Sequence, residues 1–301
     1  MQYANFMQFL NCEKILFVAN FNTSKISFFN AGGNARIGVF PKSNLELCKI
    51  IKALRRLQLP YYIIGKSSNV IFSDYGYAGV VIITKFLDKI EIIEDRLIAE
   101  CGATLSNCAI FSMSNSLSGM EFLLGIPGSV GGAIYMNSSA YGFEIKDIVE
   151  NCRIYDVEND KELELSSCDL KFCTKQSIFS NNKKLVLLSA KFKLNFWENG
   201  LIKQKMLDMT MKRIDSQPLE QYSLGSAFKR PLNSYASKLI DELSLKGFTI
   251  GGAQVSQKHA GFIVNNGQAT AGDLRKIIYE IKKKVLEKYN ILLEQEIIFV
   301  D

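Results

Sequence analysis

The sequence is short of the residues that build metal centres and covalent active sites. It has one histidine, His259, and its seven cysteines form no Cys-x-x-Cys pair. A zinc site of the usual kind needs several such ligands, so we predict no metal. A serine–histidine–aspartate triad would have to use His259, which we interpret instead as a partly buried structural imidazole. An odd number of unpaired cysteines is typical of reduced, buried thiols in a cytosolic protein.

Long apolar segments and clustered charge are also missing. The stretch ILFVANF near the amino terminus is too short to span a bilayer and lacks a cleavage-site pattern, so we expect neither membrane insertion nor a signal peptide. The net charge of +6 is spread along the chain, whereas nucleic-acid-binding proteins gather lysine and arginine into one stripe. We therefore predict a cytoplasmic protein that binds anionic small molecules and no nucleic acid.

Length and apolar content indicate a globular protein of two domains. The chain has 301 residues, of which 48% are hydrophobic, and a chain of this length commonly forms two cores. Hydrophobic spacing changes near Gly200, where a run of strands gives way to helical periodicity. We place the boundary there, with a first domain over 1–198 and a second over 199–301, and predict an α+β fold.

The periodicity predicts strands and helices throughout. A helix over 43–57 begins with Ser43 and Glu46 in the spacing of a capping box, and Thr270 with Asp273 begins a long helix over 270–290. Further helices are expected over 104–117, 200–214 and 234–247. Strands are expected over 35–41, 61–65, 69–74, 79–84, 89–94, 96–102, 152–157 and 184–196, and a final strand over 292–300.

Two glycine-containing loops in the first domain suggest a bound phosphate. The segment GIPGSVGGA has glycines at 125, 128, 131 and 132, and GKSS follows the strand over 61–65. Glycine lets backbone approach a ligand closely. The Walker pattern fails because Pro60 occupies a required glycine position, and no G-x-G-x-x-G occurs. A nucleotide-type cofactor held from two sides is one interpretation, and a turn-rich loop with a plain hairpin is the other.

In the second domain, a few polar residues stand out. Ser226 follows a glycine beside Lys229 and Arg230, although most serines in such positions are simply turn residues. Glu294 and Glu296 lie two apart on the expected final strand and would share a face. If that face were the inner one, the pair could serve as an acid or a charge stabiliser.

Several motifs together resemble one enzyme family. GMEFLLGIPGSVGGAIYMNSSAYG, KRIDSQP, GSAFKRP, KLIDELSLKG, IGGAQVSQKHAGFIVN and LEQE occur in the order seen in the UDP-N-acetylenolpyruvoylglucosamine reductases, also called MurB, and the length is similar to the type II branch. The resemblance implies a two-part FAD-binding region of the vanillyl-alcohol-oxidase (PCMH-like) type and a smaller α+β substrate domain. It also implies FAD and NADPH as cofactors, and a UDP-sugar whose enolpyruvyl group is reduced to give UDP-N-acetylmuramate for peptidoglycan.

The resemblance also assigns residues to the site. FAD would be held by Gly65, Lys66, Ser67, Ser68 and Asn69, and by Gly125, Pro127, Gly128, Ser129, Gly131 and Gly132. Ser226 matches the proton donor of the family and Glu296 its catalytic glutamate. The segments that face the substrate in the family contain Lys212, Arg213 and Gln254, and Lys229 and Arg230 would contact the diphosphate.

The sequence departs from the family at its third catalytic position. FCTKQSIF aligns with F-x-Y-R-x-S-x-F, which puts Lys175 in place of the arginine and Thr174 in place of the tyrosine. Lysine keeps the charge but loses the fork that grips a carboxylate. Two alternatives therefore stand beside the reductase: a degenerate paralogue that binds FAD or UDP-sugar without turnover, and another oxidoreductase of the same flavin fold. We expect a monomer.

Overall fold

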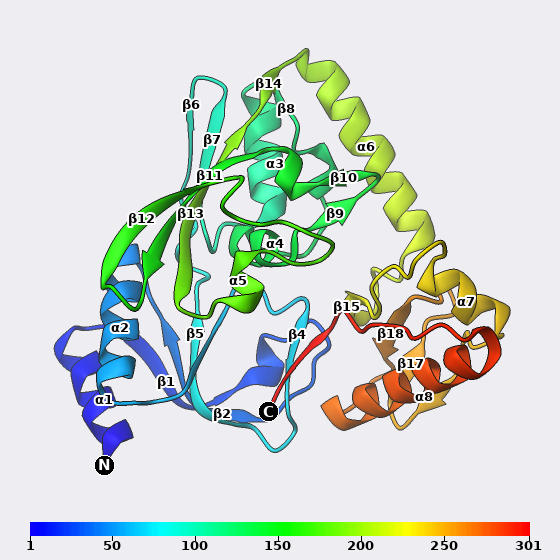
Figure 1. Cartoon of the computed structure of the whole chain (residues 1–301), viewed down its shortest axis with the longest axis horizontal. Helices are drawn as coiled ribbons and strands as arrows, with labels where there is room; N and C mark the ends of the chain where they lie inside the picture. The colour runs from blue at the N-terminus through cyan, green and yellow to red at the C-terminus, as the bar shows by residue number, and fades with distance from the viewer. The chain divides into compact units, whose positions relative to one another are not determined.

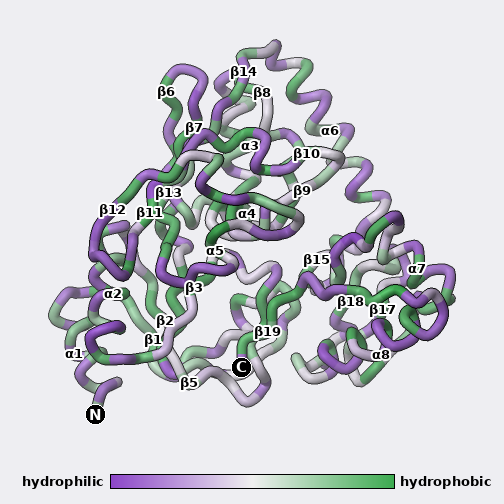
Figure 2. Tube along the Cα trace, viewed as in Figure 1, coloured by the Kyte–Doolittle hydropathy of each residue, from purple (hydrophilic) through white to green (hydrophobic).

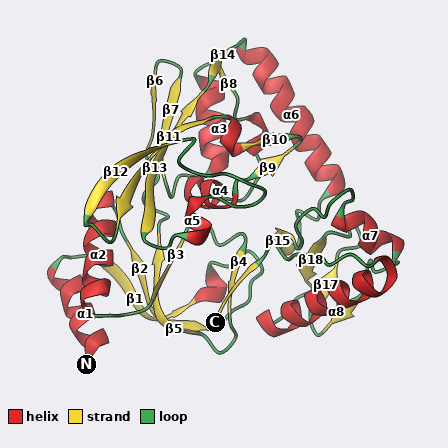
Figure 3. Cartoon of the chain, in the orientation of Figure 1, coloured by secondary structure: helices red, strands yellow, loops and turns green.

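The computed structural model describes residues 1–301 and has the expected α+β character, with helices and strands in both of its compact units (Figure 3). The first unit consists of Met1–Ala19, Ile37–Lys66 and Gly79–Met211. The second consists of Asn20–Arg36, Ser67–Ala78 and Lys212–Asp301. The change of unit near the carboxyl end falls at 211/212 rather than 198/199, and two earlier segments join the second unit. The assignment of 1–198 to FAD and 199–301 to substrate stays a prediction.

The first unit is built around a five-stranded antiparallel sheet in the order β12-β11-β13-β7-β6 (Figure 1). Its strands are β6 (Ile90–Ile93), β7 (Arg96–Glu100), β11 (Val149–Asp156), β12 (Lys161–Ser166) and β13 (Leu185–Lys193). Helices α3 (Leu105–Ser114) and α4 (Val130–Met136) contact this sheet. The predicted alternation is confirmed, because Leu188, Ala190, Phe192 and Leu194 are all at most 1% exposed and lie in the core.

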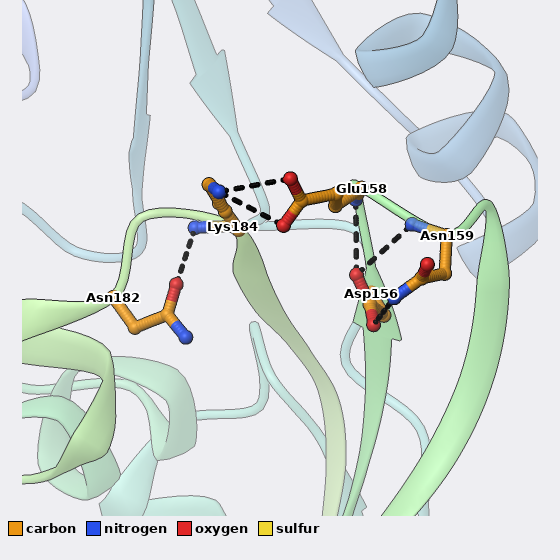
Figure 4. A network of polar contacts seen from close by, with 5 residues as sticks. All are labelled: Asp156, Glu158, Asn159, Asn182 and Lys184. Atoms are coloured by element: carbon orange, nitrogen blue, oxygen red, sulfur yellow. Dashed lines mark hydrogen bonds and ion pairs between the residues drawn. The ribbon is translucent and has the colours of Figure 1, made fainter.

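A side-chain network shapes the turn between β11 and β12 (Figure 4). The Asp156 carboxylate accepts hydrogen bonds from the backbone N–H groups of Glu158 and Asn159 and from the Asn159 amide. These bonds hold the pKa of Asp156 below its ordinary value, the Asn159 side chain having the largest effect. Lys184 pairs with Glu158 at 2.8 Å, which ties the turn to the start of β13.

A second sheet has the order β1-β2-β5-β3, with β1 (Leu16–Asn22), β2 (Asn34–Phe40), β3 (Tyr61–Ile64) and β5 (Tyr77–Ile83). Strand β3 pairs in parallel with β5, whereas β4 (Val70–Phe72) pairs in parallel with β19 (Ile298–Val300). The two strands that flank GKSS therefore belong to different sheets. The plain hairpin reading of that segment is wrong.

The helices of the first unit confirm most of the pattern. Helix α2 (Asn44–Arg56) is capped by Ser43, whose hydroxyl accepts from the Glu46 N–H at 3.2 Å, while the Glu46 carboxylate accepts from the Lys42 N–H. Helix α1 (Gln2–Cys12) lies in a stretch for which we made no prediction. The remaining elements of the first unit are α5 (Ile178–Asn181), β8 (Leu117–Ser118), β9 (Ser139–Ala140), β10 (Phe143–Glu144), β14 (Asn195–Phe196), η2 (Glu121–Leu123) and η3 (Ile145–Asp147), whereas η1 (Thr23–Lys25) lies in the second unit.

The second unit has a four-stranded antiparallel sheet in the order β15-β18-β17-β16. These strands are β15 (Tyr222–Ser226), β16 (Thr249–Ile250), β17 (Ala253–Val255) and β18 (Phe262–Asn265). Helices α7 (Ala236–Glu242) and α8 (Ala271–Tyr289) share one core with the strands. The cap predicted for α8 is confirmed, because the Thr270 hydroxyl accepts from the Asp273 N–H at 3.0 Å and the Asp273 carboxylate from the Thr270 N–H.

Two expectations about the second half are wrong. The final strand β19 begins at Ile298 rather than 292, and the residues before it make a single antiparallel bridge, between Gln295 and Phe228. Helix α7 is shorter than the predicted span of 234–247. Helix α6 (Asn199–Ser216) does occur, and hydrophilic and hydrophobic residues alternate along it (Figure 2). No helix combines the length and the apolarity that a membrane crossing requires.

The cysteines only partly follow the prediction of buried thiols. All seven are free. Cys101, Cys108 and Cys152 are buried, and burial raises the pKa of the first two to about 12. Cys12, Cys168 and Cys173 are exposed instead.

Candidate functional site

The two glycine-containing loops of the first unit meet in the structure. A Cβ on Gly65 would lie 2.0 Å from the Ser129 hydroxyl oxygen, so only glycine allows the turn after β3 to touch the start of α4. Gly131 is held similarly, with a Cβ position 3.0 Å from the Cys101 carbonyl oxygen. Gly65 and Gly131 are therefore required because other protein atoms lie where a side chain would be. Gly132 is exposed, and the nearest atom to its Cβ position is 3.6 Å away.

The Ser129 side chain fixes the beginning of α4. Its hydroxyl accepts from the Gly132 N–H at 3.3 Å and caps the helix, and the residue is 2% exposed. The segment is also bridged to Thr104, next to the amino terminus of α3. Gly125 turns the chain before α4 with φ of +79°, a conformation that most side chains disfavour. The glycine loop is thus a fixed structure.

An ion pair between a buried carboxylate and a half-buried lysine anchors the chain just before the glycine loop, residues 125–132. The Glu121 carboxylate accepts from the Ser118 hydroxyl at 2.6 Å and the Gly119 N–H at 2.8 Å, and Lys205 of α6 lies 3.4 Å away. Burial by itself raises the pKa of Glu121, but these donors and the backbone N–H of Glu121 outweigh it and lower the pKa. Removal of Lys205 would leave the buried Glu121 carboxylate without its cation, which is costly.

The residues predicted to hold FAD fit a phosphate-bearing cofactor. In the first unit they supply bare backbone at Gly132, an exposed cation at Lys66 and no carboxylate. Backbone that a ligand can approach closely, together with a lysine, is suited to a pyrophosphate. Ser67, Ser68 and Asn69 belong to the second unit, where Ser67 has φ of +52° and donates to the Val70 carbonyl.

Lys175 lies in a tight turn of the first unit. Cys173 and Gln176 form an antiparallel bridge, so the turn consists of Thr174 and Lys175, and Lys175 has φ of +57°. The buried Asn137 side chain holds the turn, because its amide donates to the Cys173 carbonyl at 3.0 Å and to the Glu144 carboxylate at 3.1 Å. Burial, the largest single effect, raises the pKa of Glu144, but hydrogen bonds from Lys146 and Asn137 outweigh it and lower the pKa. The charge of Lys175 adds a smaller lowering effect.

A β-bulge presents Ser226 at the end of β15. The register with β18 shifts between Ser223 and Ser226, and Gly225 within it has φ of +76°. Such a bulge bends a strand and redirects the side chains that follow it. Ser226 is paired with Phe262 through the backbone and its side chain is exposed. The glycine–serine pair at 225–226 therefore marks a strand irregularity that leaves the Ser226 hydroxyl exposed.

Glu296 lies on the segment next to Ser226. Its N–H donates to the Ala227 carbonyl at 2.9 Å, and two residues earlier the Glu294 carbonyl accepts from the Lys229 N–H. The two proposed catalytic residues of the second unit are thus adjacent in the fold although 70 positions apart in sequence. Glu294 has a different environment, because its exposed carboxylate pairs with Lys229 at 3.1 Å.

The predicted substrate residues are spread over the second unit. The Arg230 guanidinium stacks 4.1 Å from the centre of the Tyr235 ring. Lys212 is exposed and Arg213 is buried near the carboxyl end of α6. The Gln254 amide donates to the Thr249 hydroxyl at 3.0 Å and so binds within its own hairpin.

A shallow, open cavity on the surface of the second unit was not predicted from the sequence. It is lined by Tyr235, Ser237, Lys238, Asp241, Glu242, Lys246, Lys258, His259 and Ala260. Nδ1 of His259 accepts from the Gly261 N–H at 3.1 Å, and burial lowers the pKa of His259, so the imidazole is neutral at pH 7. Lys238, Lys246 and Lys258 come from three separate segments. Because their spacing in the sequence follows no motif, this cavity has no signal in the sequence.

Two family profiles match separate parts of the chain. The family profile described as UDP-N-acetylenolpyruvoylglucosamine reductase, C-terminal domain, matches residues 217–300. A profile described as FAD binding domain matches residues 35–166.

Named relatives extend over nearly the whole chain. The UDP-N-acetylenolpyruvoylglucosamine reductase of Caldicellulosiruptor bescii is 43% identical over 297 residues, covering 98% of this chain and 94% of that protein. That of Clostridioides difficile is 42% identical over 270 residues, covering 89% and 88%. The crystal structure of the Thermus caldophilus enzyme superposes with a TM-score of 0.79 at 27% identity, covering 95% of this chain and 99% of that one.

Proposed function

The chain belongs to the family of UDP-N-acetylenolpyruvoylglucosamine reductases, and we propose that Ser226 and Glu296 of its second unit complete the reduction of the substrate. The enzyme is a flavin oxidoreductase with an FAD-binding domain, which uses NADPH to reduce the enol ether to UDP-N-acetylmuramate for peptidoglycan. The chemistry that bound FAD would supply is two-electron transfer between NADPH and the substrate. The adjacency of Ser226 and Glu296 in the fold carries the proposal.

Ser226 is proposed as the proton donor. Reduction leaves negative charge at the carbon next to the substrate carboxylate, and that carbon must take a proton to give the product. An unperturbed hydroxyl is a weak acid, but the carbanion is a far stronger base, so transfer from the Ser226 hydroxyl is downhill. The bulge at Gly225 supports this role because it leaves the hydroxyl exposed at the end of β15.

Glu296 and Lys175 are proposed to act on the substrate carboxylate and its charge. The backbone N–H of Glu296 donates to the carbonyl of Ala227, the residue after Ser226. Glu296 is therefore close enough to Ser226 to relay a proton to it or to polarise the intermediate. Lys175 supplies a cation on a turn held by Asn137. A preorganised charge aimed at a developing anion is commonly the largest contribution to catalysis.

Two sets of residues are proposed to bind the cofactor and the UDP group. FAD would be held by Gly65, Lys66, Ser67 and Ser68, by the backbone of Asn69, and by Gly125, Pro127, Gly128, Ser129, Gly131 and Gly132. Lys229 and Arg230 would bind the diphosphate, and Lys212, Arg213 and Gln254 would face the substrate. The open cavity lined by Lys246 and Lys258 is proposed as part of the same substrate site, since lysine binds phosphate. Lys246 now pairs with Asp241, an exposed pair that a phosphate can replace.

The cellular role follows from the reaction. We propose that the protein acts as a monomer in the cytoplasm, where NADPH and nucleotide sugars are made and free cysteines stay reduced. By supplying a peptidoglycan precursor it would contribute to cell wall biogenesis, cell shape, cell division and the cell cycle.

A spectroscopic experiment tests the function directly. The purified protein is expected to be yellow, to bleach with NADPH, and to recover its flavin absorbance when UDP-N-acetylenolpyruvoylglucosamine is added. Acid precipitation should release the flavin, since no covalent bond holds it. A protein that stays colourless with added FAD, or stays bleached with the UDP-sugar, would contradict the proposal.

Lys175 gives a second prediction. We expect Lys175→Arg to raise kcat/KM by about tenfold, because a guanidinium grips a carboxylate with two hydrogen bonds where an ammonium makes one. Lys171→Arg is the matched control, since Lys171 also has positive φ, at +47°, and is exposed. It should change kcat/KM by less than about twofold. Unchanged kinetics in Lys175→Arg would show that lysine already suffices at this position.

A further inference from the structure

We propose that Asn69 is a positioning residue for Glu296, an inference that rests on the catalytic role given to Glu296 above. The Asn69 side-chain amide donates to the Glu296 carbonyl oxygen at 3.1 Å. The resemblance assigns Asn69 to the cofactor with the rest of GKSSN, but in the structure this amide contacts the backbone of the glutamate. Both residues belong to the second unit.

Glu296 lies where its segment changes strand partner. Before it, the chain pairs antiparallel with the end of β15, through the Phe228–Gln295 bridge and the Glu296 N–H to Ala227. After it, the chain runs parallel to β4, and the Ile298 N–H donates to the Asn69 carbonyl at 2.9 Å. At this change of partner, the Asn69 side chain supplies the Glu296 carbonyl with the kind of bond that a ladder N–H supplies within a sheet.

Asn69 is itself held in place. Ser67, two residues before it, is 5% exposed, has positive φ, and donates its hydroxyl to the Val70 carbonyl at 3.0 Å. Val70 then begins β4 and pairs with Ile298. The amide of Asn69 therefore projects from a fixed turn, and it fixes the peptide that joins Glu296 to Ile297.

The orientation of that peptide determines where the Glu296 carboxylate points. The Ile297 side chain is 2% exposed and is anchored in the core. If the 296–297 peptide rotates, Glu296 is therefore the residue that moves. A displacement of about 1 Å can cost about a hundredfold in rate when a catalytic group must meet its partner at hydrogen-bond distance. Asn69 thus acts on the proton-transfer half of the reaction through the backbone of Glu296.

The test separates the two half-reactions. In Asn69→Ala and in Asn69→Asp, which keeps the shape but loses the donor, oxidation of the reduced flavin by UDP-N-acetylenolpyruvoylglucosamine should slow about tenfold, equivalent to about 1.4 kcal/mol. Flavin reduction by NADPH and FAD affinity should stay within about twofold. In the apo-protein of both variants, amide hydrogen exchange at Ile297 and Ile298 should become faster. Asn199→Ala, which removes a side-chain bond to the Met113 carbonyl, is the control and should leave all four readouts unchanged.

A double-mutant cycle identifies the route of the effect. In a Glu296→Gln background, Asn69→Ala should cause little further slowing, because residues acting as a unit are not additive. Equal slowing with and without Glu296, or a loss confined to FAD affinity and flavin reduction, would overturn the inference. If Glu296→Gln alone oxidises flavin at the parent rate, the catalytic role of Glu296 is wrong and the inference falls with it. If Glu296→Gln is slow but Asn69→Ala is not, only the role of Asn69 is wrong.

Discussion

Ser226→Ala is expected to reduce its flavin with NADPH at close to the parent rate and then to oxidise it with UDP-N-acetylenolpyruvoylglucosamine about a thousandfold more slowly. General acid catalysis by a positioned side chain typically contributes between a hundredfold and ten-thousandfold. Alanine removes the hydroxyl at the end of β15 without touching the backbone pairing of position 226 with Phe262. The loss should therefore fall on the protonation step, and rapid-mixing absorbance of the flavin measures both steps in one sample.

Ser223→Ala is the matched control for this variant. Ser223 lies in the same strand, on the other side of the bulge, and pairs with Val264. Its replacement should leave both half-reactions within about twofold of the parent. If Ser226→Ala oxidises its flavin as fast as Ser223→Ala does, then Ser226 is not the proton donor.

Gly65→Ala is expected to destabilise the protein by about 2–3 kcal/mol, the typical result of overpacking a closed contact. The new methyl would overlap the Ser129 hydroxyl, which lies 2.0 Å from the Cβ position, and Ser129 Cβ at 2.8 Å. Ser129 is buried and its hydroxyl caps α4, so it cannot move aside without opening the glycine loop. FAD affinity should fall with stability. Urea unfolding followed by circular dichroism, and flavin fluorescence on titration, measure the two effects.

Gly200→Ala is the matched control, and we expect it to stabilise the protein slightly rather than destabilise it. Gly200 lies near the start of α6, and the nearest atom to its Cβ position, on the Glu198 side chain, is 3.6 Å away. Alanine in a helix is favoured over glycine by about 0.5–1 kcal/mol, so this variant should be slightly more stable with unchanged FAD affinity. A Gly65→Ala protein as stable as the Gly200→Ala protein would show that the two loops need not touch.

Local patterns in the sequence predicted the elements that local physics controls. Ser43 and Thr270 cap their helices because a hydroxyl three residues before a free N–H is within reach in any helix. The alternation of Leu188, Ala190, Phe192 and Leu194 marks one face of a strand whatever lies against it. These features need no knowledge of distant residues.

The predictions that failed depend on contacts between distant residues. The strand over 292–300 is apolar enough in sequence, but its first part makes a single bridge, at Phe228, and only its last three residues pair, with β4. The hairpin reading of GKSS failed for the same reason, since β4 has its partner more than two hundred residues away. The cavity around Lys246 and Lys258 likewise arises from segments that only the fold brings together.

The glycine loop shows how a motif can be predicted while its physical reason is missed. The sequence suggested that bare backbone makes room for a ligand, and Gly132 fits that explanation. Gly65 and Gly131 are needed instead because other protein atoms occupy the space of a side chain. A single sequence cannot distinguish the two reasons, since both demand the absence of a Cβ.

The chain passes between its two units five times, and this has a consequence for synthesis. The second unit takes in residues 67–78, whose Asp74 carboxylate accepts from the N–H groups of Ala271 and Gly272 at the start of α8. Strand β4 of the same segment pairs with β19, which is made more than two hundred residues later. On the ribosome, β4 therefore has no strand partner until residues 298–300 have been made. A fragment that starts at 199 would lack both the Asp74 carboxylate, which accepts from the first N–H groups of α8, and the partner of β19. A gene fusion or truncation at that point would leave the second unit unable to close.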